Sequence, residues 1–255
     1  MSRYFIKLGY RGAPFHGWQI QPNAVSVQEE IEKALSTVLR VPTSIVGAGR
    51  TDTGVNARTM YAHFDYDGIL PEKGRLLVSL NRLVGRDISI HDIFKVADDA
   101  HARFDAIERT YKYFVAFEKT PFFYPLSWHC PNGLDLDKMN DAAKLLLKTE
   151  DFTSFAKLHS DAKTNICKVT RAEWTMEENM AIFTISADRF LRNMVRAIVG
   201  TLVDVGRGKL TLDQFQNVID RKDRCSAGQS MPGEALFLWD IRYPFISLEE
   251  AICKK

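Results

Sequence analysis

The order of strand and helix patterns along the chain constrains its fold most. Segments with alternating apolar residues, which indicate strands, are mixed with segments whose apolar residues repeat every three or four positions, which indicate helices. The mixture occurs as two similar series. Strands are predicted over 4–10, 44–48, 60–66, 87–96, 111–117, 172–176, 181–186 and 236–243. Helices are predicted over 26–40, 72–84, 135–148, 190–205 and 212–220.

Two mixed series predict an α+β fold with two similar halves, each an antiparallel or mixed sheet with helices on one face. A chain of 255 residues is long enough for one large domain or two smaller ones. We expect an N-terminal half over 1–106, a C-terminal half over 107–245 and a tail over 246–255. The loop over 120–134, which is rich in proline and glycine, and the last ten residues are the candidate flexible segments.

The composition is that of an ordinary soluble globular protein, with 45% hydrophobic and 26% charged residues. No apolar run approaches the length of a membrane span, and the N-terminus lacks an apolar signal region. We therefore expect a cytoplasmic protein without a membrane partner. The formal net charge of +2 excludes a polycation but allows basic clefts.

The cysteines do not form a pattern typical of metal or disulfide sites. They lie far apart, without a Cys-x-x-Cys pair, which predicts reduced thiols and neither a zinc site nor a disulfide framework. The four positions are Cys130, Cys167, Cys225 and Cys253.

A candidate reactive loop follows the predicted strand over 44–48. It reads Gly49-Arg50-Thr51-Asp52-Thr53-Gly54 and places one carboxylate between glycines, which permit tight turns and close approach of the backbone to a ligand. Asp52 could act as a nucleophile, a general base or a metal ligand, and Arg50 could hold it ionised or bind a phosphate. The alternative is an Asp that only hydrogen-bonds its own turn.

Basic and aromatic residues form further candidate contacts. Arg189, Arg192 and Arg196 have helical spacing and are expected on one face of the helix over 190–205, where they would bind anions, unless the face is simply solvated. Tyr111 follows Arg109 on a predicted strand and could stack on a base, although strand tyrosines are often packing residues. The loop over 10–22 contains Tyr10, Phe15 and Trp18 together with His16, a composition often found in binding loops.

Together these segments resemble the TruA family of tRNA pseudouridine synthases, over about residues 4 to 243. The motifs that carry the resemblance are Phe15-His16-Gly17-Trp18-Gln19, Ser26-Val27-Gln28, Gly49-Arg50-Thr51-Asp52, His101-Ala102-Arg103-Phe104, Arg109-Thr110-Tyr111, Asp151-Phe152-Thr153-Ser154-Phe155 and Phe190-Leu191-Arg192-Asn193-Met194-Val195-Arg196. The chain departs from the family pattern at Asn56, Cys167 and Ala235, which puts RNA contacts and local packing in question more than the chemistry.

The resemblance implies a pseudouridine synthase fold with an active-site cleft between the halves. It implies an enzyme, an isomerase that converts uridine to pseudouridine on a flipped-out nucleotide in the anticodon stem-loop of tRNA, at positions 38 to 40. The Asp of its motif is the nucleophile, which carries over to Asp52, with Tyr111 and Arg196 as further catalytic residues. The RNA-binding candidates are Arg50, Tyr111, His16, Trp18, Gln19, Arg58, Arg109, Arg189 and Arg192.

The implied reaction involves no redox step and imports no group, so we expect no cofactor and no metal. The family resemblance also implies a homodimer that binds one tRNA. Two other interpretations remain open: an RNA-binding protein that has lost its chemistry, and a related synthase that acts on another RNA uridine. The intact Asp52 argues against the first, because a carboxylate repels phosphate.

Overall fold

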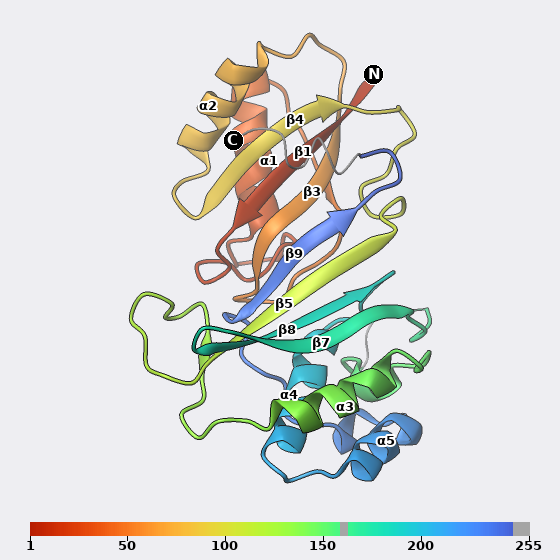
Figure 1. The fold of residues 1–255 in the computed structure, drawn as a ribbon. Helices are drawn as coiled ribbons and strands as arrows, with labels where there is room; N and C mark the ends of the chain where they lie inside the picture. Colours follow the sequence, from red (N-terminus) through yellow and green to blue (C-terminus); the bar gives the residue numbers. More distant parts are fainter. Residues whose placement is uncertain (159–162, 247–255) are drawn as a thin grey trace. The chain divides into compact units, whose positions relative to one another are not determined.

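The computed structural model describes residues 1–158 and 163–246. Contacts within the chain divide it into two compact units. Unit 1 consists of Met1–Ile107 together with the chain from Leu238 onward, and unit 2 consists of Glu108–Phe237. Of the expected tail, residues 247–255 lie outside the described part of the chain. Both units combine strands and helices, as Figure 1 shows, which confirms the predicted α+β class.

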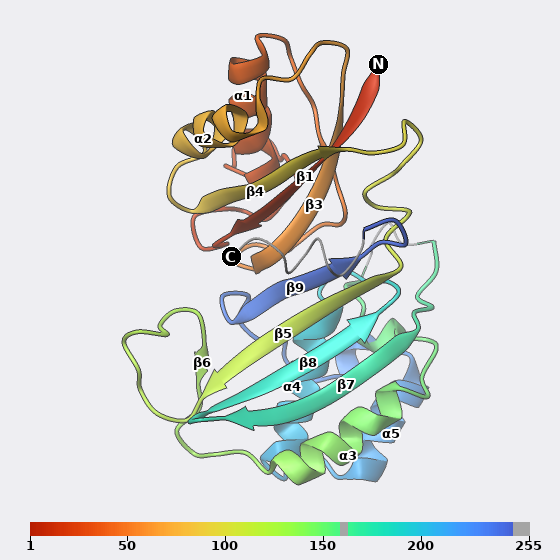
Figure 2. The ribbon, with the colours of Figure 1, turned by 45° about the horizontal axis from the view of Figure 1, so that its top comes forward.

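Unit 1 is built on three long antiparallel strands. β1 (Ser2–Tyr10) lies between β3 (Asn56–Tyr66) and β4 (Ile88–Lys95), and the short β2 (Val46–Gly47) pairs with β3. Helices α1 (Val27–Leu39) and α2 (Lys73–Leu83) cover one face of this sheet (Figures 1 and 2). β3 begins four residues earlier than its alternating pattern indicates, so it starts only three residues after Thr53.

Helix α1 shows how local sequence fixes an element. Ser26 has extended backbone dihedrals, and its Oγ accepts a hydrogen bond from the Glu29 backbone N–H at 3.3 Å, so it caps the helix. Val27, Ile31 and Leu35 then lie on one face and are fully buried. The cap and the apolar stripe together position the chain that precedes β2.

Unit 2 repeats this layering. β8 (Met180–Ala187) lies between β5 (Glu108–Ala116) and β7 (Val169–Glu177), antiparallel to both. Helices α3 (Leu136–Leu146), α4 (Met194–Gly206) and α5 (Leu212–Arg221) pack on one face of this sheet, as Figure 2 shows. Two 3-10 helices, η1 (Thr153–Phe155) and η2 (Arg224–Ser226), contact each other, and η1 also contacts α4 and α5. A buried aromatic group that includes Phe152, Phe155 and Phe215 forms part of its core.

The loop over 120–134 contains a strand that the sequence does not predict. β6 (Trp128–His129) pairs in parallel with the end of β5, with Trp128 opposite Val115. A two-residue strand is too short to show alternation, which explains why its pattern is not recognisable in the sequence.

The last strand, β9 (Leu236–Arg242), differs from its sequence assignment. The sequence places it in the second half, but from Leu238 onward its contacts belong to unit 1. The Ile107 N–H donates to the Arg242 carbonyl oxygen at 2.9 Å, and the Tyr243 hydroxyl donates to the Ala102 carbonyl oxygen at 2.5 Å. Alternation predicts a strand but does not specify its partners. Only the tertiary structure therefore shows that the chain returns to unit 1 at Leu238.

Candidate active site

The Asp52 loop connects β2 to β3 in unit 1. The Val55 N–H donates to the Asp52 carbonyl oxygen at 3.2 Å, and Gly54 in this turn has a φ of 77°, a conformation that favours glycine. Thr51 is buried, whereas Asp52 is half-buried and Arg50 is exposed. The carboxylate therefore sits on a constrained turn between a buried residue and the start of a long strand.

The loop after β1 fixes this turn from one side. The Tyr10 hydroxyl and the Thr51 Oγ1 share a buried hydrogen bond of 2.9 Å, and the Trp18 N–H donates to the Thr51 carbonyl oxygen at 3.3 Å. At Gly12 an added Cβ would lie 2.3 Å from the Val55 carbonyl oxygen, so the two loops touch through their backbones. These contacts preorganise the segment that carries Asp52.

Asn56, one of the departures from the family pattern, has a structural role. Its side chain is buried, and its Oδ1 accepts a hydrogen bond from the Gly12 N–H at 2.8 Å. It thus joins the loop after β1 to the first residue of β3. An amide suits this task, because it accepts this bond without carrying a charge into the core.

The remaining candidates of unit 1 differ in exposure. His16, Gln19 and Arg58 are exposed, and the Arg58 guanidinium lies 4.5 Å from the ring centre of Trp239. Trp18 is only 3% exposed, and an added Cβ at Gly47 would lie 2.5 Å from its indole. Trp18 thus packs beneath the loop, and we do not retain it as a direct RNA contact; its place in an aromatic loop gave no signal of this burial.

In unit 2, Tyr111 lies in β5 opposite Ile185 and is half-buried. Its ring meets Phe190 edge-on, with 5.0 Å between ring centroids, which restricts the orientation of the phenol. Arg109 on the same strand donates from Nη1 to the Asp188 carbonyl oxygen at 2.7 Å. Both side chains are therefore held against the segment that leaves β8.

The predicted arginine face on one helix is wrong. Helix α4 begins at Met194, because the preceding Asn193 has a left-handed φ of 67° that interrupts helical geometry. Arg189 and Arg192 therefore lie in the connection before the helix, and only Arg196 is on it. Arg192 is exposed and Arg189 is half-buried, so any phosphate contact by them would come from a loop.

Arg196, in the first turn of α4, is held by the backbone of Met231. Its Nε donates to the Met231 carbonyl oxygen at 2.6 Å, and its own carbonyl oxygen accepts from the Met231 N–H at 3.1 Å. The buried phenol of Tyr113 lies close enough for the two groups to interact electrostatically. Burial raises the pKa of Tyr113 well above its ordinary value, and the Arg196 charge opposes this only in part. Tyr113 is thus a neutral neighbour of Arg196.

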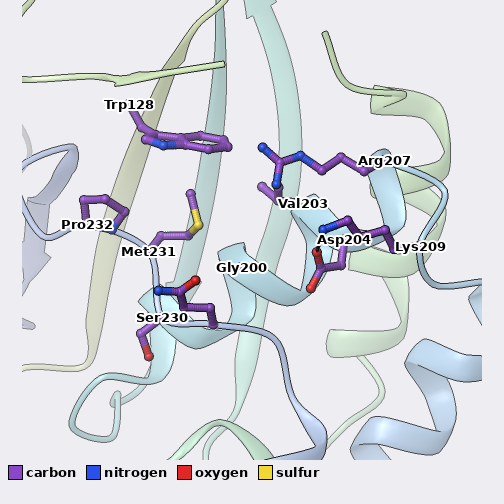
Figure 3. A pocket seen from close by; sticks show the side chains of 10 residues that line it. Trp128, Gly200, Val203, Asp204, Arg207, Lys209, Ser230, Met231 and Pro232 are labelled. Carbon is purple, nitrogen blue, oxygen red and sulfur yellow. Dashed lines mark ion pairs between the residues drawn. The ribbon is translucent and has the colours of Figure 1, made fainter. Parts of the chain in front are cut away.

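A hollow of about 460 Å³ lies beside the same segment (Figure 3). Gly200 and Val203 of α4 line it on one side, and Met231 and Trp128 line it on others. Its cations already have partners in the chain: the Arg207 guanidinium lies 5.3 Å from the Trp128 ring centre, and the Lys209 Nζ lies 3.7 Å from Asp204 Oδ1. The sequence gives no signal for this hollow, because its walls come from distant segments.

Within the described ranges 1–158 and 163–246, no group of three or more His, Cys, Asp or Glu residues is arranged to hold a metal. Cys130 and Cys167 are buried and Cys225 is exposed, all as free thiols. Burial raises the pKa of Cys167 to about 12, so this thiol stays protonated near neutral pH. No helix in the described part of the chain is long and apolar enough to cross a membrane.

Comparisons with known proteins agree with the resemblance seen in the sequence. The family model described as tRNA pseudouridine synthase matches residues 142–244. The chain is 57% identical over 244 residues to tRNA pseudouridine synthase A of Parabacteroides distasonis, covering 96% of this chain and 97% of the relative. It is 55% identical to the protein of that name from Bacteroides fragilis, with 96% and 97% covered.

A more distant relative, tRNA pseudouridine synthase A of Bacillus subtilis, is 38% identical over 243 residues, with 92% of this chain and 97% of the relative covered. The aligned regions cover nearly the full length of both chains, so they include the Asp52 loop as well as unit 2. The chain belongs to the tRNA pseudouridine synthase A family.

Proposed function

We propose that this chain isomerises uridine to pseudouridine in the anticodon stem-loop of tRNA, at positions 38 to 40, with Asp52 as the nucleophile. The observation that carries the proposal is the Asp52 turn, held by Tyr10, Gly12 and Trp18, in a chain 57% identical to a tRNA pseudouridine synthase A. A turn stabilised from a neighbouring loop is typical of a site that must present one side chain in a fixed direction.

In the proposed reaction the bond between ribose C1′ and uracil N1 breaks, the uracil turns, and C5 bonds to C1′. The proton leaves C5 and N1 gains one, so substrate and product have the same composition. Asp52 forms the covalent intermediate either at the ribose or at the uracil ring. The target nucleotide leaves the base stack first, at a cost of a few kcal/mol.

Tyr111 and Arg196 of unit 2 act with Asp52 in this proposal. The Tyr111 ring, restricted by Phe190, would stack on the uracil, and Arg196 would serve as the counter-ion of the carboxylate. Further side chains would contact the RNA backbone or the displaced strand. They are the exposed His16, Gln19, Arg50 and Arg58, together with Arg109, Arg189 and Arg192.

We further propose that the protein acts as a cytoplasmic homodimer on tRNA. Light scattering of the purified protein at micromolar concentration should give twice the mass of one chain. The mass of a single chain at that concentration would contradict the dimer without affecting the proposed chemistry.

Pseudouridine mapping tests the function directly. Unmodified tRNA incubated with the protein should gain pseudouridine at positions 38 to 40, and tRNA from cells that lack the protein should have uridine there. Pseudouridine at other RNA positions alone would favour a related synthase with another target. Binding of tRNA without any pseudouridine would indicate a non-catalytic RNA-binding protein.

A further inference from the structure

We propose that Arg224 is a positioning residue for Arg196 and acts through the segment 227–231, which we name the strap. The inference rests on the proposed function, because it assumes that Arg196 serves the reaction. Arg224 lies in η2, and its guanidinium donates hydrogen bonds to the strap. What links the two arginines is a continuous set of hydrogen bonds through the strap.

Arg224 holds the strap at three points. Its Nη1 donates to the carbonyl oxygens of Ala227 at 3.5 Å and Gly228 at 3.1 Å, and its Nη2 donates to the Ser230 Oγ at 2.8 Å. A planar guanidinium presents several donors in a fixed arrangement, so one side chain can serve two carbonyls and a hydroxyl together. Lysine, with a single ammonium group, cannot reproduce this geometry.

Asn193 supports the same hydroxyl from the start of α4. Its Nδ2 donates to the Ser230 Oγ at 2.6 Å, so this oxygen accepts hydrogen bonds from both Asn193 and Arg224. Asn193 makes no side-chain cap bond to the helix, although asparagine is a preferred residue at helix starts. Its side chain donates to Ser230 of the strap instead.

The strap is also pressed closely against α4. The Gly228 N–H donates to the Thr201 Oγ1 at 2.9 Å, and a Cβ added at Gly200 would lie 1.8 Å from the Gln229 carbonyl oxygen. Figure 3 shows Ser230 and Met231 beside Gly200. The strap therefore cannot shift toward the helix, and the Arg224 bonds oppose a shift away from it.

Met231, the last residue of the strap, is hydrogen-bonded to Arg196. Met231 both accepts from the Arg196 Nε and donates to its backbone carbonyl, so its position sets where the guanidinium lies. An arginine side chain loses rotamer freedom when it is ordered, and the strap provides contacts that offset this entropic cost. Loss of the Arg224 bonds would leave Arg196 in place but less precisely oriented.

The test measures kcat and KM for pseudouridine formation in Arg224→Gln, with Arg221→Gln as the matched control. Arg221 is an exposed arginine in the last turn of α5, outside the strap network. Arg224→Gln should lower kcat about ten- to hundredfold and leave KM for tRNA within about threefold, because misorientation of a catalytic group affects the chemical step. Arg224→Lys should recover little of this loss, and Arg221→Gln should match the wild type.

A double-mutant cycle separates positioning from a general loss of structure. If Arg224 acts through Arg196, then Arg224→Gln should add little to the kcat loss of Arg196→Lys. Should Arg224→Gln unfold, Ser230→Ala performs the same test, because it removes only the hydroxyl that Arg224 and Asn193 share. A wild-type kcat in the folded variants, or losses that multiply in the cycle, would overturn the inference. Pseudouridine formation by the wild type would still uphold the proposed function in that case.

Discussion

Among single residues, Arg192 is well placed for a phosphate contact. It is an exposed cation in the connection that precedes α4, and its backbone carbonyl is fixed by a hydrogen bond from the Lys157 N–H at 3.0 Å. A fixed backbone limits the space that the side chain can search, which lowers the entropic cost of binding an anion.

If Arg192 neutralises one phosphate, Arg192→Gln should reduce the slope of log affinity for tRNA against log salt by about 0.7 to 0.9. Fluorescence anisotropy with labelled tRNA over a range of salt concentrations measures this slope. Arg221→Gln removes an equally exposed arginine and should leave the slope unchanged. Equal slopes in all three proteins would assign Arg192 to ordinary surface.

Residues of one predicted binding loop differ in their burial. Trp18 and His16 occur in one loop for which the sequence predicts RNA contacts, yet Trp18 is buried and His16 is exposed. Their difference arises from Gly47, which leaves room for the indole. Such a contact joins distant positions, and a single sequence contains no signal for it. For the same reason the sequence does not predict the hydrogen bonds of Arg224, because they form only in the folded strap.

Among the elements, the turn after β4 depends on two neutral histidines. The His63 Nδ1 accepts a hydrogen bond from the Ala102 N–H at 3.1 Å, and the His101 Nδ1 accepts from the Arg103 N–H at 3.1 Å. The two imidazole rings lie 4.6 Å apart. A protonated Nδ1 cannot accept either bond, so this turn requires both rings to be neutral.

This requirement predicts a loss of stability in mild acid. Burial first, and the Arg3 charge second, lower the pKa of His63 from 6.5 to about 4. The unfolded chain therefore binds a proton more readily between these values, and the free energy of unfolding should fall as pH decreases from 6.5 to 4. One such group contributes about 3 kcal/mol at most over this window.

Urea unfolding at pH 7 and pH 4.5 measures the effect. His63→Asn keeps a hydrogen-bond acceptor but does not titrate, so its stability should change less than that of the wild type over this range. His129→Asn, at an exposed histidine, should follow the wild type. Identical pH dependence in the wild type and His63→Asn would show that His63 does not control the turn.

Local signals predicted elements well where the sequence itself contains the cause. Ser26 marks the start of α1 because its own side chain caps the helix. The apolar pattern predicts the start of α4 four residues early, because it continues through Asn193, whose left-handed backbone no periodicity reveals. The sequence does not predict β6, because this strand depends on pairing with β5 rather than on its own pattern.

For the chain as a complete fold, the two α+β units follow from the two mixed series of patterns. The patterns do not predict that the chain from Leu238 onward belongs to unit 1. This assignment depends on contacts such as that of Tyr243 with Phe5, at the opposite end of the sequence. Their rings lie 5.4 Å apart. Contacts between residues so distant in sequence are invisible to any window of local pattern, whereas motif resemblance supplied the family directly.

The most direct test of the account replaces Asp52 by Asn, which keeps the shape of the side chain but removes its charge and nucleophilicity. Release of tritium from tRNA that contains uridine labelled at C5 measures turnover, since C5 loses its hydrogen when it bonds to the ribose. Asp67→Asn, at an exposed acid of unit 1, serves as the control and should release tritium at the wild-type rate. We predict that Asp52→Asn binds tRNA within a few fold of the wild type and releases no tritium; appreciable release would contradict the assignment of Asp52 as the nucleophile.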